Sequence, residues 1–238
     1  MTTYPGLMSL CINEVKVEIQ EFISRERAKG DCCRFLSACF YQPRKDVFLQ
    51  EELFKNLTEA LSQISVDAAA ASDAMEKAFL KYSEEDLTVN YAKLFIGPNE
   101  LIAPPYGSVY VDKERRLMGA STIEVIEIYR EAGLSMDEEF REVPDHITAE
   151  LEFMYYLIFK EVEALEKSEN NTALYFMGMQ VSFFSRFLGQ WLLPFCEKIK
   201  EGTDNEFYRN LAACLSAFAG YLHPGDDIPG ALKSKTVN

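Results

Sequence analysis

Three side chains near residue 146 could bind a metal ion or transfer protons. His146 and Glu150 are four residues apart and would lie on one face of a helix, and Glu142 precedes His146 by four residues. Imidazole and carboxylate groups bind zinc and also act as general acids and bases. Zinc sites usually have three or four ligands with a recognisable spacing, and the one other histidine is His223. The pattern therefore favours no bound metal, but it leaves open a helical metal-dependent enzyme that uses these three residues.

Other residues that often carry chemistry do not form a known catalytic pattern. The six cysteines lack the CxxC spacing of zinc and redox sites, so we expect them to pack in the core. The sequence has no P-loop, no GxGxxG, no GxSxG and no HExxH pattern. These residue types therefore indicate no active site, and we predict that the protein carries no metal or organic cofactor.

Charge and hydropathy restrict the partners. The chain has 24 basic and 38 acidic residues, which gives a formal net charge of −14. This charge argues against a nucleic-acid partner, whose phosphates require a basic surface. Apolar runs are too short for stable membrane insertion, and the first residues lack a basic secretory region. We expect a cytoplasmic protein.

Helical periodicity dominates the chain and predicts an all-α fold with nine or ten helices. Apolar residues recur every three or four positions at 53–64, 147–165 and 207–222, and residues 173–193 have a similar pattern. The 147–165 helix is apolar on several faces and should be central. Further expectations concern helix starts: Ser83 with Asp86 and Ser121 with Glu124 fit capping boxes, and Asp145 is the expected N-cap of the central helix.

Two segments interrupt the helical pattern. Residues 96–112 contain three prolines and two glycines, which predicts a long non-helical connection. Its apolar and aromatic side chains indicate either a functional loop or an ordered crossover over the core. Residues 133–145 are acidic and include a glycine and a proline, which is typical of a hinge between two helical halves.

Five blocks of residues stand out in and around these segments. They are Tyr91-x-x-Leu94-Phe95-x-Gly97-Pro98, Pro104-Pro105-Tyr106-x-Ser108-Val109-Tyr110-x-Asp112, Gly119-x-Ser121-Thr122, Glu142-Val143-Pro144-Asp145-His146-Ile147 and the helix and turn at Cys33–Pro43. These blocks resemble the TorD/DmsD family of chaperones, which bind twin-arginine signal peptides of molybdenum-cofactor oxidoreductases. The blocks occur in the family's order and extend from about residue 31 to residue 223. The proline before Asp145 is one place later than in the family pattern.

The resemblance implies one compact multi-helix chaperone domain at 31–238, preceded by an N-terminal helical extension at 1–30. Such a chaperone catalyses no reaction and holds the leader of a precursor until the cofactor is inserted, before export. The client would be a reductase similar to DMSO or TMAO reductase, or a formate dehydrogenase. Relatives that exchange domains make 133–145 the natural hinge, so the chain would be a monomer or a domain-swapped homodimer.

Several residues become candidate peptide contacts through this resemblance. The predicted site consists of Tyr106, Tyr110, Asp145, His146, Gly97, Pro98, Pro104, Pro105, Ser108 and Glu142. Aromatic rings and carboxylates suit a leader with two arginines, because a guanidinium group stacks on tyrosine and pairs with carboxylate. One alternative is an assembly chaperone for the catalytic subunit of a nitrate-type reductase, which would have the same architecture.

Overall fold

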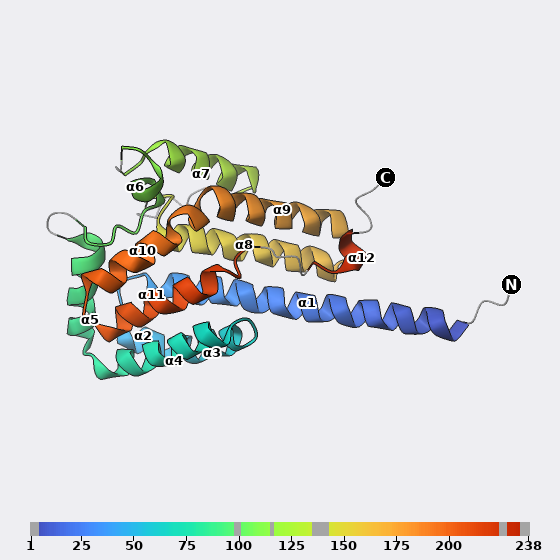
Figure 1. Cartoon of the computed structure of the whole chain (residues 1–238), viewed down its shortest axis with the longest axis horizontal. Helices are drawn as coiled ribbons and strands as arrows, with labels where there is room; N and C mark the ends of the chain where they lie inside the picture. The colour runs from blue at the N-terminus through green and yellow to red at the C-terminus, as the bar shows by residue number, and fades with distance from the viewer. Residues whose placement is uncertain (1–4, 98–100, 115–116, 135–142, 224–227, 234–238) are drawn as a thin grey trace.

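The structure is a computed structural model that describes residues 5–97, 101–114, 117–134, 143–223 and 228–233. These residues form helices and no strand, apart from one isolated β-bridge, which confirms the predicted all-α class (Figure 1). The elements are α1 Pro5–Cys39, α2 Lys45–Gln50, α3 Leu53–Ser62, α4 Val66–Lys81, α5 Glu84–Tyr91, the π-helix η1 Ala92–Ile96, α6 Gly107–Val111, α7 Ala120–Glu131, α8 Ile147–Glu166, α9 Asn170–Arg186, α10 Leu188–Gly202, α11 Glu206–Ala219 and α12 Gly230–Lys233.

Helix α8 lies between α1 and α9, as Figure 1 shows. On the other side of α1, helix α3 packs against both α1 and α4. Helix α11 packs against α4 and α10. Most residues of α8 are buried, including Leu151 and Met154, which are fully covered. The expectation of a central helix at 147–165 is confirmed, although Phe159 remains half exposed.

Phenylalanine rings from α2, α3, α4 and α11 pack together in one part of the core. The Phe54 and Phe79 ring centroids are 4.7 Å apart, and Phe207 lies 5.3 Å from Phe79. Phe48 stacks on Phe79 at 5.5 Å. Most members of the apolar stripes predicted at 53–64 and 207–222 are buried, although Ile64 is only partly buried. The structure also buries Ala60, Tyr208, Ala212 and Ala219. Cysteines at 32, 33, 39, 196 and 214 are also buried, as expected of core residues.

The two predicted capping boxes have different outcomes. At α5, the Ser83 side chain accepts from the Asp86 N–H and Asp86 accepts from the Ser83 N–H, which confirms the first box. The second prediction is wrong, because α7 begins at Ala120 and Gly119 is its N-cap. The N–H of Ser121 instead donates to the Asp112 carboxylate at 3.3 Å, so a residue from the preceding segment stabilises this helix start.

The single helix suggested by the pattern at 173–193 is divided in two. Phe187 has φ −127° and ψ −91°, which is outside the helical region, so α9 ends at Arg186 and α10 begins at Leu188. A Cβ atom on Gly189 would lie 2.6 Å from the Phe184 carbonyl oxygen. The absence of a side chain at 189 therefore permits the sharp turn that redirects the chain.

The prediction of a fully non-helical segment at 96–112 is also wrong in part. Residues 107–111 form the short helix α6, and the Ser108–Val111 stretch, which alternates like a strand, is helical. Helix α1 runs without a break through residue 30, so the proposed 1–30 extension and the first family-like block share one helix. Most of the proposed hinge, residues 135–142, lies outside the described residues. Within the described residues, every helix is too short or too polar to span a lipid bilayer.

Candidate functional site

The two family-like segments meet at the start of α8, in a region that we call the junction (residues 104–110 and 143–150). Tyr106 and His146 form an antiparallel β-bridge. The Gly107 N–H donates to the Asp145 carbonyl at 2.9 Å, and the Ile147 N–H donates to the Pro105 carbonyl at 2.9 Å. These backbone bonds hold the proline-rich loop against the first turn of α8.

Asp145 is buried in the junction, with 1% of its surface exposed. Its Oδ2 accepts from the Ser108 N–H at 2.6 Å, so the carboxylate lies at the N-terminal end of α6. No hydrogen-bond donor among the described residues reaches Asp145 Oδ1, and the buried Ser108 hydroxyl likewise has no partner among them. The expectation that Asp145 caps α8 is wrong, because its carboxylate accepts the Ser108 N–H of the loop and His146 is the N-cap instead.

His146 is the N-cap of α8. Its Nδ1 accepts from the Thr148 N–H at 3.2 Å and lies 2.7 Å from the Thr148 hydroxyl. Since an acceptor nitrogen carries no proton, the neutral ring has its proton on Nε2. Burial lowers the pKa of His146 to about 4. The Tyr106 ring meets the imidazole edge to face at 5.2 Å, so His146 is a neutral structural residue beneath the loop.

Glu150 and Trp191 form a buried polar pair behind α6. The indole Nε1 donates to Glu150 Oε2 at 2.9 Å, and both residues are at most 1% exposed. Burial, together with the nearby Asp145 charge, raises the pKa of Glu150 well above its usual range, against the effect of the Trp191 hydrogen bond. A Cβ atom on Gly107 would lie only 2.9 Å from Trp191 Nε1, so this position has no room for a side chain.

Trp191→Phe should lower the free energy of unfolding by about 1–3 kcal/mol, because it leaves the buried Glu150 carboxyl without its donor. Urea unfolding followed by circular dichroism measures the change. The double variant with Glu150→Leu removes both polar partners and should recover part of the loss. If the double variant were as unstable as the sum of the two single variants, the hydrogen bond would contribute nothing.

Two tyrosines of the junction are partly buried, and the hydroxyl of Tyr110 points inward without a hydrogen-bond partner among the described residues. Tyr106 and Tyr110 are partly exposed, and Tyr110 stacks on Trp191 with centroids 5.5 Å apart and an interplanar angle of 24°. The ammonium of Lys198 lies 5.7 Å from the Tyr110 ring centroid. Exposed apolar side chains are frequent in the chain around the junction and on the neighbouring helix α10: Ile96, Ile102, Val111, Leu117, Met118, Ile123 and Leu193.

The junction brings together seven of the ten residues predicted from the sequence: Tyr106, Tyr110, Asp145, His146, Pro104, Pro105 and Ser108. Gly97 ends η1 with φ 53°, a left-handed conformation that suits glycine, and its N–H donates to the Ala92 carbonyl within η1 at 2.6 Å rather than to α8. Pro98 and Glu142 lie outside the described residues. Sequence reasoning missed Gly107 and Trp191, although Trp191 is the chain's single tryptophan.

His146 and Glu150, the two residues of the possible metal site, form hydrogen bonds within the protein. His146 Nδ1 is used by Thr148, and Glu150 Oε2 is used by Trp191. The described residues contain no group of three or more His, Cys, Asp or Glu side chains placed to bind a metal ion. Both side chains thus serve the packing of α8 in this structure.

Known chaperones are similar in sequence to this chain. The chain is 28% identical over 133 residues to the chaperone protein TorD of Vibrio parahaemolyticus, covering 56% of this chain and 60% of the relative. It is 35% identical over 119 residues to the Tat proofreading chaperone DmsD of Salmonella typhi, covering 49% and 57%. The crystal structure of a redox enzyme maturation protein from Archaeoglobus fulgidus matches with a TM-score of 0.49 at 23% identity, over 83% of this chain and 93% of that one.

The match with these first two curated relatives spans less than two thirds of their length. A family model described as nitrate reductase delta subunit matches residues 52–197, which include the junction and Trp191. This match covers more than half of the chain and agrees with the resemblance to TorD and DmsD found in the sequence. The chain therefore belongs to the nitrate reductase delta subunit family, to which its TorD- and DmsD-like blocks also assign it.

Proposed function

We propose that the chain is a cytoplasmic chaperone for a molybdenum-cofactor oxidoreductase and that the junction binds the twin-arginine leader of the precursor. The observation that carries this proposal is the aromatic loop held on α8 by backbone hydrogen bonds, in which the rings of Tyr106 and Tyr110 are partly exposed. Exposed apolar side chains such as Ile102 and Val111 lie in the chain next to it. Where exposed apolar side chains are contiguous, they often mark an interaction site. The chaperone would need no cofactor and would catalyse no reaction.

The two parts of a leader suit two parts of this surface. Its apolar run would pack on side chains such as Ile102 and Val111, and its arginines would stack on the tyrosine rings. Asp145 lies directly behind the loop with one oxygen that lacks a donor among the described residues. Because His146 is neutral above its lowered pKa, it does not repel a guanidinium group at neutral pH.

Lys198 opposes the binding of an arginine at the Tyr110 ring. Its ammonium lies over the Tyr110 ring, so an incoming guanidinium group would have to displace it to stack there. The net charge of −14 acts in the other direction at long range and favours the approach of a cationic peptide. A leader must also be released before export, and micromolar binding, about −8 kcal/mol, suits such a cycle.

The site is tested by isothermal titration of the full chain with the client's leader peptide. Tyr106→Ala removes a stacking ring, and Asp145→Asn removes the buried charge while keeping an acceptor for the Ser108 N–H. Asp145→Asn should weaken binding about ten- to a hundred-fold, the range expected for loss of a charge-assisted contact. Tyr106→Ala should also weaken binding, because a ring on which a guanidinium group would stack is lost. Thermal melts of the same samples show whether the fold is intact.

The matched control is Tyr175→Ala, which removes a half-exposed tyrosine from α9. It should leave leader affinity unchanged. A leader in which lysines replace both arginines should bind more weakly to the wild type, since lysine cannot stack or pair in the same planar way. Unchanged affinity in both junction variants, with folding intact, would place the leader on another face.

A second function is favoured by the family match itself. The matching family model is described as nitrate reductase delta subunit. This description favours a chaperone that assists assembly of the catalytic subunit of a nitrate-type reductase. Capture from anaerobically grown cells separates the two functions. Recovery of a precursor only when it carries its leader supports leader binding, and recovery of a leaderless catalytic subunit supports the assembly function.

A further inference from the structure

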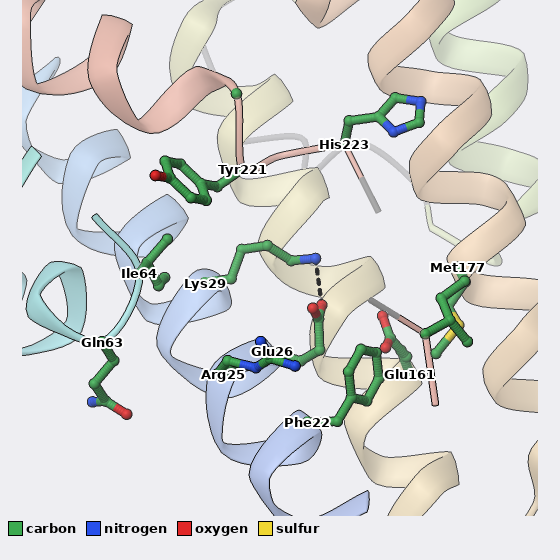
Figure 2. Close-up of a pocket in the computed structure, with 12 residues that line it drawn as sticks. Phe22, Arg25, Glu26, Lys29, Gln63, Ile64, Glu161, Met177, Tyr221 and His223 are labelled. Atoms are coloured by element: carbon green, nitrogen blue, oxygen red, sulfur yellow. Dashed lines mark ion pairs between the residues drawn. The ribbon is translucent and has the colours of Figure 1, made fainter. Parts of the chain in front are cut away.

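A cavity of about 350 Å³ lies among α1, α8, α9 and the segment that follows α11 (Figure 2). Its walls include Phe22, Glu26 and Lys29 from α1, Glu161 from α8, Met177 from α9 and Tyr221. Exposed side chains such as Tyr221 line its rim, so the cavity opens to solvent. The α1 residues and Tyr221 lie outside residues 52–197, so the family match does not extend to these walls.

Three of these side chains form a buried charged group. Lys29, 5% exposed, is ion-paired with Glu26 one turn earlier on α1, as Figure 2 shows. Glu161 is 1% exposed, and its Oε2 accepts from Gln180 Nε2 at 2.5 Å. No hydrogen-bond donor among the described residues reaches Glu161 Oε1. Lys29 is ion-paired with Glu26, and Glu161 forms no ion pair with any cation in the part of the chain that the structure describes.

A buried carboxyl group with an open acceptor is costly unless a donor fills it. The cavity beside Glu161 is large enough for a group of the size of an arginine side chain, because ligand pockets begin at about 300 Å³. Phe22 and Tyr221 supply aromatic surface, which favours a flat, weakly hydrated cation over a compact ammonium. We propose that this cavity binds a guanidinium group, whose N–H donors fill Glu161 Oε1.

Protonation of Glu161 should be linked to this binding. Burial and the nearby Glu26 charge raise the pKa of Glu161 to about 8, while Lys29 and the Gln180 hydrogen bond act in the opposite direction. At pH 7 the empty site therefore holds a proton, which a cation must displace. The other charged or titratable groups that line the cavity are Arg25, Tyr221 and His223, all exposed side chains on its rim. Affinity should consequently rise with pH up to about 8.

This site is separate from the junction and does not depend on leader binding. Glu161 is eleven residues beyond Glu150 on α8, which corresponds to about 16 Å along the helix axis. The guanidinium group could come from a free small molecule or from an arginine side chain of a peptide. These two sources share the same chemistry and can be separated by the choice of probe.

The test is isothermal titration of the full chain with agmatine and with N-acetylarginine amide, at pH values from 6.5 to 8.5. Agmatine represents a free guanidinium ligand, and the amide represents an arginine within a peptide. The neutral control is N-acetylcitrulline amide, which has the same shape without the charge. Binding of either cation, with no binding of the citrulline compound and tighter binding at higher pH, is the expected result.

Two variants of α8 test the role of Glu161. Glu161→Gln keeps the shape but removes the charge, and it should weaken binding at least ten-fold and abolish the pH dependence. Glu163→Gln is the matched control, because Glu163 pairs with Lys160 and Lys167 outside the cavity. Equal binding of the citrulline compound, no binding of either cation to the wild type, or unchanged affinity in a folded Glu161→Gln variant would overturn the proposal. The wild-type comparisons remain decisive even if that variant does not fold.

Discussion

Replacing Phe79 with alanine should lower the free energy of unfolding by about 3–5 kcal/mol, the range measured for large aromatic truncations in a core. Phe79 is fully buried and contacts the rings of Phe48, Phe54 and Phe207, so truncation leaves a cavity that three helices would have to close. Urea unfolding monitored by circular dichroism measures the change. The slope of the unfolding free energy against urea concentration should stay the same, because the surface exposed on unfolding hardly changes.

The control is Phe159→Ala on α8, which removes the same side chain from a half-exposed position. This variant should lose less than about 1 kcal/mol, as is usual for surface substitutions. A similar loss in both variants would mean that the phenylalanine cluster does not provide a tightly packed core.

Acid should destabilise the protein by up to about 3 kcal/mol through His146 alone. The pKa of His146 is lowered from 6.5 to about 4 in the folded state, and one pKa unit corresponds to about 1.4 kcal/mol. Between these values the unfolded chain binds the proton and the folded chain does not, so stability falls as the pH falls from about 6.5 to 4. Below pH 4 the folded ring also takes up the proton, which its role as acceptor at the start of α8 opposes.

His146→Asn isolates this effect, because asparagine is a good N-cap that does not titrate. Glu150 is a buried acid whose pKa is raised, so acidification stabilises the folded protein through this group. This contribution partly masks the effect of His146 in the wild type. These contributions cancel when the two proteins are compared at each pH by urea unfolding. The wild type should lose more stability than the variant between pH 6.5 and 4, and parallel curves would contradict the assignment of a neutral buried His146.

The helical class and the core positions could be predicted because they depend on local periodicity. Leu57 and Leu61 on α3, like Leu211 and Leu215 on α11, are fully buried at the spacing that the sequence shows. The Ser83 capping box could also be predicted, since both of its partners lie within one helical turn. Such features need no knowledge of distant parts of the chain.

The features that sequence reasoning placed wrongly depend on distant contacts. Asp145 looks like an N-cap, but its carboxylate is taken by the N–H of Ser108, 37 residues earlier. His146 then becomes the cap of α8. Ser121 likewise donates its N–H to Asp112 rather than forming its own box. A polar residue near a helix start therefore indicates that a cap exists but does not identify which helix it serves.

The pairing of helices also has a consequence for how the chain acquires its structure. Helix α1 packs on α8, and α4 packs on α11, so each pair joins residues more than a hundred positions apart. Proteins dominated by such non-local pairs fold more slowly than helical bundles with neighbouring contacts. During synthesis, the apolar faces of α1 and α4 emerge from the ribosome long before their partners exist. Until α8 and α11 have been made, the first half of the chain can bury these apolar faces mainly against α3.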